Sequence, residues 1–314
     1  SRVQGKPQDN IEENRTIRNT DPHVREGVNI LIDWICGDGY NLSPRNIEGT
    51  DISQTQEEVG KIRKLLAGSG IWSEVTRFVD AAITDGHAYI ELVVENETFK
   101  PRLLPTEKVL RKTDEFGQVV QYGLLPPDST ASVSNRQEIP DEATKYEPHE
   151  IAELWFKKKP NQRMGQSLID GIKEHADILR DMELDYARFV ATKAYPPIIW
   201  NCGTQEEKWT RSQIDNWLDS VEAVEPDSMI AAPHDVEHDI VGVTSTSSTA
   251  GAMRLEETFK HFEKRVVTGL GIPAVLMNMD EVPDKEASIM PSFKRRIKRL
   301  RNIVAEVIEN QIFR

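Results

Sequence analysis

Cysteine is scarce in this chain of 314 residues, which contains two. Cys36 and Cys202 lie far apart and show neither a CxxC pair nor a metal-ligand spacing, so we expect free thiols of a reducing compartment. Long apolar runs are also lacking, and no window approaches the roughly 18 uncharged apolar residues that indicate a membrane span. Residues Ser1 to Gln4 lack the apolar core of a secretory signal. We therefore expect no membrane association.

The chain also lacks a phosphate-binding loop. No GxxxxGK[ST] pattern occurs, so ATP hydrolysis by such a loop is not expected. Gly269 and Gly271 could open a dinucleotide fingerprint, but they follow a helical pattern where a strand is required, and Ala274 occupies the third glycine position. A glycine helix stop before Pro273 explains them better. No cofactor is expected.

Catalytic patterns are lacking too, since Gly68-Ser69-Gly70 has no flanking nucleophile-elbow pattern. His234 and His238, with carboxylates between them, are the pair that most resembles a metal site. The apolar residues around them favour a strand, on which two such side chains would lie about 13 Å apart, too far to share an ion. We expect no metal and no enzyme activity. A monomeric metal-dependent hydrolase that uses these two histidines is the alternative from another class.

Acidic residues outnumber basic ones, 52 to 39, and the formal net charge is -13. The surface as a whole should repel nucleic acid, and an ordinary acidic protein is the simplest interpretation. Six cations nevertheless lie within eight residues: Lys294, Arg295, Arg296, Lys298, Arg299 and Arg301. They are candidates for sequence-independent, salt-sensitive contact with DNA phosphates. The alternative is a solvated helix face neutralised by acidic neighbours or by another subunit.

Hydrophobic periodicity predicts an α+β chain. We expect helices at 21–37, 57–68 and 71–85 and a long one from Ser167 to Pro196-Pro197, with strands at 88–94, 100–104, 108–112, 118–124 and 151–156. Residues 1–20 are expected to form a polar arm, and residues 126–148 a surface loop.

A small insert is predicted between two long helices, with a strand at 198–201, a helix at 210–222 and a strand-rich stretch at 229–243. The second long helix, Met253 to Gly269, should be followed by a loop from Ala274 to Pro291. A final helix then places its cations around an apolar stripe formed by Phe293, Ile297, Leu300, Val304 and Val307 or Ile308.

Several short segments follow one another in a recognisable order. They are Asp21 to Ile30, Asp85 to Leu92, Met164 to Leu168, and the helix end at Val266 to Pro273 followed by Glu286-Ala287-Ser288. In this order they resemble the portal proteins of tailed viruses, which form the ring at one capsid vertex through which DNA enters and leaves. Asp21 to Ile30 resembles that family's first wing helix, Asp85 to Leu92 its G-x-A-Y-x-E strand and Met164 to Leu168 its G-x-S-x-L entry to the stem, and the resemblance covers about residues 20 to 314.

The resemblance implies an α+β portal subunit with a defined order of parts. These would be a wing domain with an N-terminal arm at 1–165, stem helices at 166–195 and 247–270 around a small α/β clip domain at 196–246, a tunnel loop at 271–291 and a wing or channel helix at 292–314 that leads to a crown. The narrowest part of the tunnel would be formed by Asn278, Met279, Asp280, Glu281, Val282, Pro283, Asp284 and Lys285.

The resemblance further implies a homo-oligomeric ring, typically of twelve subunits, for DNA packaging, head-to-tail joining and genome ejection. Its partners would be double-stranded DNA in the channel, the major capsid protein, a terminase and a tail adaptor. The location would be the capsid vertex of a virion assembled in the host cytoplasm, and the acidity would fit a virus of a halophilic host. A helical adaptor or scaffold that does not enclose DNA is the third interpretation.

Overall fold

The computed structural model describes residues 2–4, 8–39, 41, 52–95, 98–129, 138–159, 162, 164–194, 198–202, 208–222, 236–240, 248–277 and 283–313. The chain forms two compact units, one of Ser1–Leu179 with Lys260–Arg314 and the other of Arg180–Phe259. Both boundaries lie within long helices, α5 (Lys173–Ala194) and α7 (Ser248–Leu270).

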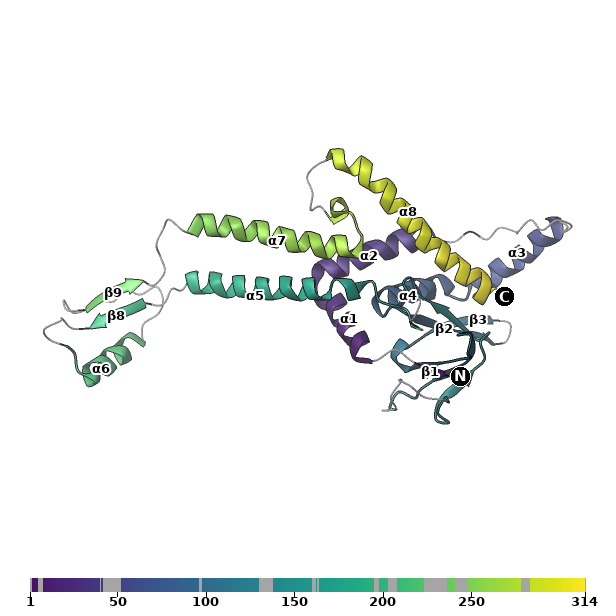
Figure 1. The fold of residues 1–314 in the computed structure, drawn as a ribbon, viewed down its shortest axis with the longest axis horizontal. Coiled ribbons are helices and arrows are strands. Elements are labelled where there is room, and N and C mark those ends of the chain that lie inside the picture. The colour runs from purple at the N-terminus through teal and green to yellow at the C-terminus, as the bar shows by residue number, and fades with distance from the viewer. Residues whose placement is uncertain are drawn as a thin grey trace. The chain divides into compact units, whose positions relative to one another are not determined.

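The larger unit contains a three-stranded sheet of order β3-β2-β7 and a four-stranded sheet of order β1-β4-β5-β6, both antiparallel (Figure 1). Their strands are β1 (Arg2–Gln4), β2 (Ala88–Glu95), β3 (Thr98–Leu104), β4 (Val109–Thr113), β5 (Val119–Leu124), β6 (Thr144–Tyr146) and β7 (Ile151–Leu154). The five strands predicted by alternation, β2 to β5 and β7, are confirmed. The mixture of helices and sheets confirms the α+β class.

Helices surround the three-stranded sheet. They are α1 (Gln8–Thr20), α2 (Pro22–Cys36), α3 (Ile52–Ala67), α4 (Ile71–Thr84) and α8 (Pro283–Val307). Helix α4 packs on β2 and β3, and α2 packs against α1, α4 and α8. The Asp21 side chain caps α2 by accepting hydrogen bonds from the backbone N–H groups of His23 and Val24, at 2.8 and 2.9 Å. The apolar side chains of α2, Val24, Val28, Leu31, Ile32 and Ile35, are buried.

The expected N-terminal arm is wrong for residues 8–20, which form α1. Ile11 and Ile17 are buried together with Asn14, so this helix is part of the core. Two apolar side chains in 13 residues give too little periodicity to predict a helix, and burial against α2 and α4 supplies the missing stabilisation. The surface loop expected at 126–148 likewise contains a short strand, β6, which pairs with β5.

Helix α7 ends as the sequence predicts. The N–H of Ile272 donates to the carbonyl of Val267 at 3.2 Å and that of Gly271 to Thr268 at 2.8 Å, the pair of bonds found in a Schellman cap. Gly271 has a φ of 73°, a left-handed conformation that favours glycine. A Cβ atom there would also collide with the guanidinium of Arg296 on α8. The glycines at this turn therefore stop a helix and allow α8 to approach it.

The loop expected from Ala274 to Pro291 is wrong in its second half. A short 3₁₀ helix, η3 (Ala274–Met277), follows the cap, and α8 begins at Pro283 and continues through Pro291. A proline suits the first turn of a helix, where its missing N–H leaves no bond unmade, and Pro283 holds that place. The expected helix start at residue 292 is therefore wrong, since the helix continues through Pro291 although an internal proline usually ends a helix.

The smaller unit contains the predicted insert. Strands β8 (Ile198–Cys202) and β9 (Val236–Ile240) form an antiparallel pair, and α6 (Arg211–Glu222) lies between them in sequence. The rings of Trp209 and Trp217 pack edge to face with their centres 6.4 Å apart. The rings of Tyr186 of α5 and Phe259 of α7 pack in the same way, with their centres 5.6 Å apart. Among the described helices, none has a window that is long and apolar enough for a membrane span.

The contact between Gly271 and Arg296 gives a stability prediction. Gly271→Ala should lower the free energy of unfolding by about 2 kcal/mol or more, because left-handed backbone costs a Cβ-bearing residue roughly 1–2 kcal/mol and Arg296 must also move. The control is Gly117→Ala, since Gly117 also has a positive φ but open space around it, and about 1 kcal/mol is expected there. Urea unfolding measures both. Equal losses would contradict a role for Arg296.

Candidate functional site

The six cations of the basic segment, defined as Lys294, Arg295, Arg296, Lys298, Arg299 and Arg301, all lie on α8. The predicted apolar stripe of that helix is confirmed. Its buried residues are Phe293, Ile297, Leu300, Val304 and Val307. At 3.6 residues per turn, Arg296 and Arg301 flank this stripe, whereas the other four cations lie on the opposite side.

The structure divides the basic segment accordingly. Arg301 donates from Nε to the carbonyl of Trp34 at 2.8 Å and forms an ion pair with Asp38 at 2.7 Å. Arg296 is half-buried beside Gly271, and burial, together with the charge of Arg299, lowers the pKa of its guanidinium. The remaining four, Lys294, Arg295, Lys298 and Arg299, are exposed. Arg296 and Arg301 therefore take part in packing, and the side chains of the other four are exposed.

The predicted tunnel-loop residues and the two histidines of the alternative metal site are described only in part. Residues 278–282 of the expected tunnel loop and His234 lie outside the described residues. Pro283, Asp284 and Lys285 form the first turn of α8, and His238 lies on β9, opposite Trp200 of β8. A strand at His238 agrees with the prediction. No group of three or more potential metal ligands occurs within the described ranges.

The two short motifs of the sequence analysis meet at one buried corner. The N–H of Gly165 donates to Nδ1 of His87 at 3.1 Å, and a Cβ at position 165 would collide with the carbonyl oxygen of Gly86. Ser167 donates from Oγ to the carbonyl of Ile83 at 3.0 Å and accepts from the N–H of Ile169. The chain thereby passes from β7 to α5 across the end of α4. These motif residues serve the fold.

His87 connects this corner to a buried charge cluster. Because Nδ1 accepts from Gly165, Nε2 carries the proton and donates to Glu153 at 3.3 Å. Arg111 donates to the other oxygen of Glu153 at 2.8 Å. Burial raises the pKa of Glu153, but the hydrogen bond from His87 and the charge of Arg111 outweigh it, and the net pKa is lowered. The carboxylate is thus ionised and fully engaged, so the cluster offers no general acid or base to solvent.

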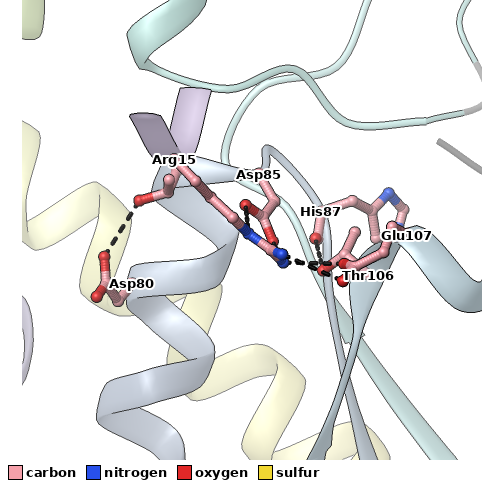
Figure 2. A network of polar contacts seen from close by, with 7 residues as sticks. Arg15, Asp80, Asp85, His87, Thr106 and Glu107 are labelled. Carbon is pink, nitrogen blue, oxygen red and sulfur yellow. Dashed lines mark hydrogen bonds and ion pairs between the residues drawn. The ribbon is translucent and has the colours of Figure 1, made fainter. Parts of the chain in front are cut away.

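A second network fastens α1 to the same corner, as Figure 2 shows. Arg15 donates to both oxygens of Asp85, at 3.0 and 2.7 Å, and to both oxygens of Glu107, at 3.2 and 2.9 Å. Thr106 donates to the carbonyl of His87 at 3.0 Å. Burial raises the pKa of Asp85, although Arg15 opposes this. The sequence analysis missed this network because it treated α1 as an arm. His87 was inside a recognised motif, but its partners are distant in sequence.

Comparison of the sequence with protein-family models and with curated proteins gives no match. Comparison of the structure does. A chain of the native gene transfer agent (GTA) virion aligns with 99% of this chain and 84% of its own length, at 13% identity and a TM-score of 0.66. A chain of the native GTA neck, computed with C12 symmetry, aligns with 99% of this chain and 83% of its own, at 13% identity and a TM-score of 0.65.

An HK97-family phage portal protein from Corynebacterium diphtheriae also aligns, with 87% of this chain and 82% of its own length, at 11% identity and a TM-score of 0.46. The chain has a phage portal-like fold. The resemblance inferred from the order of short segments is thus confirmed at the level of the fold. In this fold, the segments Gly86 to Tyr89 and Gly165 to Leu168 form the two sides of the buried corner at His87.

The buried position of His87 predicts how stability depends on pH. Burial lowers its pKa below the ordinary value of 6.5, although the bond to Glu153 opposes the shift. The unfolded chain therefore binds a proton that the folded chain excludes, and the free energy of unfolding should fall as the pH drops below about 6.5. His87→Gln should flatten this fall between about pH 6.5 and 5.

Urea unfolding over a pH series gives the free energy of unfolding at each pH. The slope of this free energy against pH measures the effect, even where the variant is less stable overall. His149 is exposed, and His149→Gln serves as the control, with the slope expected to match that of the unaltered chain. An unchanged slope for His87→Gln would show that His87 is not the titrating group.

Proposed function

We propose that this chain is one subunit of a ring-shaped head-tail connector that surrounds DNA during packaging and ejection, with no catalytic activity or cofactor of its own. The supporting observation is the likeness of fold over 99% of the chain to a chain of a GTA neck computed with C12 symmetry. Twelve copies are therefore the proposed number. A head-tail connector is a component of the virion, and assembly in the host cytoplasm is part of the proposal.

The proposed parts follow the chain order of a portal subunit. The wing comprises residues 1–165, the stem helices 166–195 and 247–270, and the clip domain 196–246. The tunnel loop was expected at 271–291, but α8 begins at Pro283, so we now assign the loop to 271–282 and the channel helix to 283–314. The proposed partners are double-stranded DNA, the major capsid protein, a terminase and a tail adaptor.

The proposed DNA contact uses the exposed part of the basic segment. Lys294, Arg295, Lys298 and Arg299 form no ion pair with another residue that the structure describes, whereas Arg301 is paired with Asp38. In a chain of net charge -13, four neighbouring exposed cations give a local positive potential. The acidic remainder would repel DNA, so a duplex in the channel would be held at few points and would move easily.

The ring is tested by native mass spectrometry and electron microscopy of the purified chain. A species of many times 35.7 kDa with a central hole wide enough for a duplex is expected, with residues 278–282 of the tunnel loop at its narrowest point. A monomer would contradict the proposal, and a closed oligomer without a hole would favour the adaptor alternative. Another segment at the narrowest point would contradict the tunnel-loop assignment alone.

The DNA contact is tested with Arg295→Gln, Lys298→Gln and Arg299→Gln combined. Loss of three phosphate contacts should reduce the slope of log affinity against log salt by roughly 2–3, measured by fluorescence anisotropy with duplex DNA. The matched control replaces the exposed Lys61, Arg63 and Lys64 of α3 by Gln, with the same change in net charge. Equal slopes for the two variants would contradict a specific role for α8. Loss of the oligomer in the first variant would instead assign these cations to a contact between subunits.

A further inference from the structure

A second basic surface lies where β7 ends, and neither the sequence analysis nor the proposed function includes it. Three consecutive lysines, here called the lysine loop, follow Trp155 and Phe156: Lys157, Lys158 and Lys159. All three are exposed. They are far from the basic segment of α8 in sequence, although α8 and the adjoining η4 (Ile308–Ile312) pack against β7.

The charges of the lysine loop are not neutralised by described residues. Glu153 is the carboxylate whose charge acts on Lys158, but its two oxygens are already engaged by His87 and Arg111. Arg111 lies 5.8 Å from the centre of the Trp155 ring and Lys158 lies 4.6 Å from it, so two cations share one aromatic side chain. Partial burial, followed by the charge of Arg111, lowers the pKa of Lys158. A bound anion would relieve this repulsion.

The lysine loop is also held in place. The N–H of Gln166 donates to the carbonyl of Lys157 at 2.7 Å, which joins the two sides of the loop just before the buried corner at Gly165. The ammonium of Lys158 is positioned over Trp155 by a cation–π contact. Lysine side chains on a fixed backbone lose less conformational entropy when they bind than those on a freely moving segment. This arrangement suits a binding surface better than a solvated tail.

We propose that the lysine loop binds the phosphate backbone of nucleic acid, as a second DNA-contacting surface of this chain. Lys157 and Lys159 supply two ammonium groups to phosphate oxygens, and Lys158 on Trp155 anchors the loop. Ammonium groups act as point charges without base-edge geometry, so the contact is independent of sequence and weakens with salt. The proposal does not depend on the ring, since it concerns the loop of a single subunit.

The test uses the full chain in whatever oligomeric state it adopts. Lys157→Gln with Lys159→Gln leaves the Lys158 anchor in place, and Lys61→Gln with Lys64→Gln on α3 is the control of equal charge. Anisotropy with a labelled DNA duplex is followed between about 50 and 200 mM salt. The lysine-loop variant should reduce the slope of log affinity against log salt by roughly 1–2 relative to the control. Lys157→Arg with Lys159→Arg should restore the slope of the unaltered chain.

Two outcomes would overturn the proposal. The first is a slope for the lysine-loop variant equal to that of the α3 control, and the second is failure of the arginine variant to keep the slope of the unaltered chain. Native mass spectrometry of the same samples tests the ring of the proposed function independently. If no ring forms, the salt slopes of the variant and the control can still be compared, so the two proposals can fail separately. If only the α8 variant reduced the slope of log affinity against log salt, the DNA contact of the proposed function would be supported and the lysine loop would not be a DNA-binding surface.

Discussion

The close approach of Gly165 to Gly86 is the constraint on which the larger unit depends. No side chain fits between these two backbones, and His87 uses both ring nitrogens to hold the segments together. The end of α4, the start of β2 and the entry to α5 are therefore fixed at one point. Both sheets connect to it, because Glu153 of β7 joins His87 to Arg111 of β4.

This corner shows how an acidic protein can hold charges in its interior. Arg111, Glu153 and His87 are buried, yet each has a partner, and the neutral histidine avoids a second buried cation. Within the part of the chain that the structure describes, the exposed cations of α8 and of the lysine loop have no ion-pair partner. At the buried corner, by contrast, every charged group is matched. A net charge of -13 conceals this arrangement.

Elements with a strong apolar pattern could be predicted from the sequence. Helix α2 has a capping aspartate, a proline at its first position and a full apolar stripe, so its start and its buried face were correct. Helix α1 could not be predicted, because its stabilisation comes from Arg15 and Asn14 reaching partners much later in the chain. The start of α8 was misplaced because a proline inside a helix is tolerated only where the surrounding residues compensate.

The position of the candidate site could be predicted from the sequence, but the roles of its individual residues could not. The basic segment of α8 could be found by counting charges, but the separation of Arg296 and Arg301 from the other four required the positions of Gly271, Trp34 and Asp38. The lysine loop is short, and three lysines in a row carry little information without Trp155 beneath them. Sequence patterns therefore identified surfaces, and three-dimensional contacts identified which side chains are available on them.

The attachment of α1 has a consequence for the order in which the chain folds during synthesis. Asn14 donates to Asp170, which is 156 residues later, and Lys173 pairs with Glu13. Arg15 needs Asp85 and Glu107. Helix α1 is thus synthesised long before Asp170 and Lys173, so it can pack its apolar face on α2 and α4 first and acquires its last polar partners only after both sheets have been made.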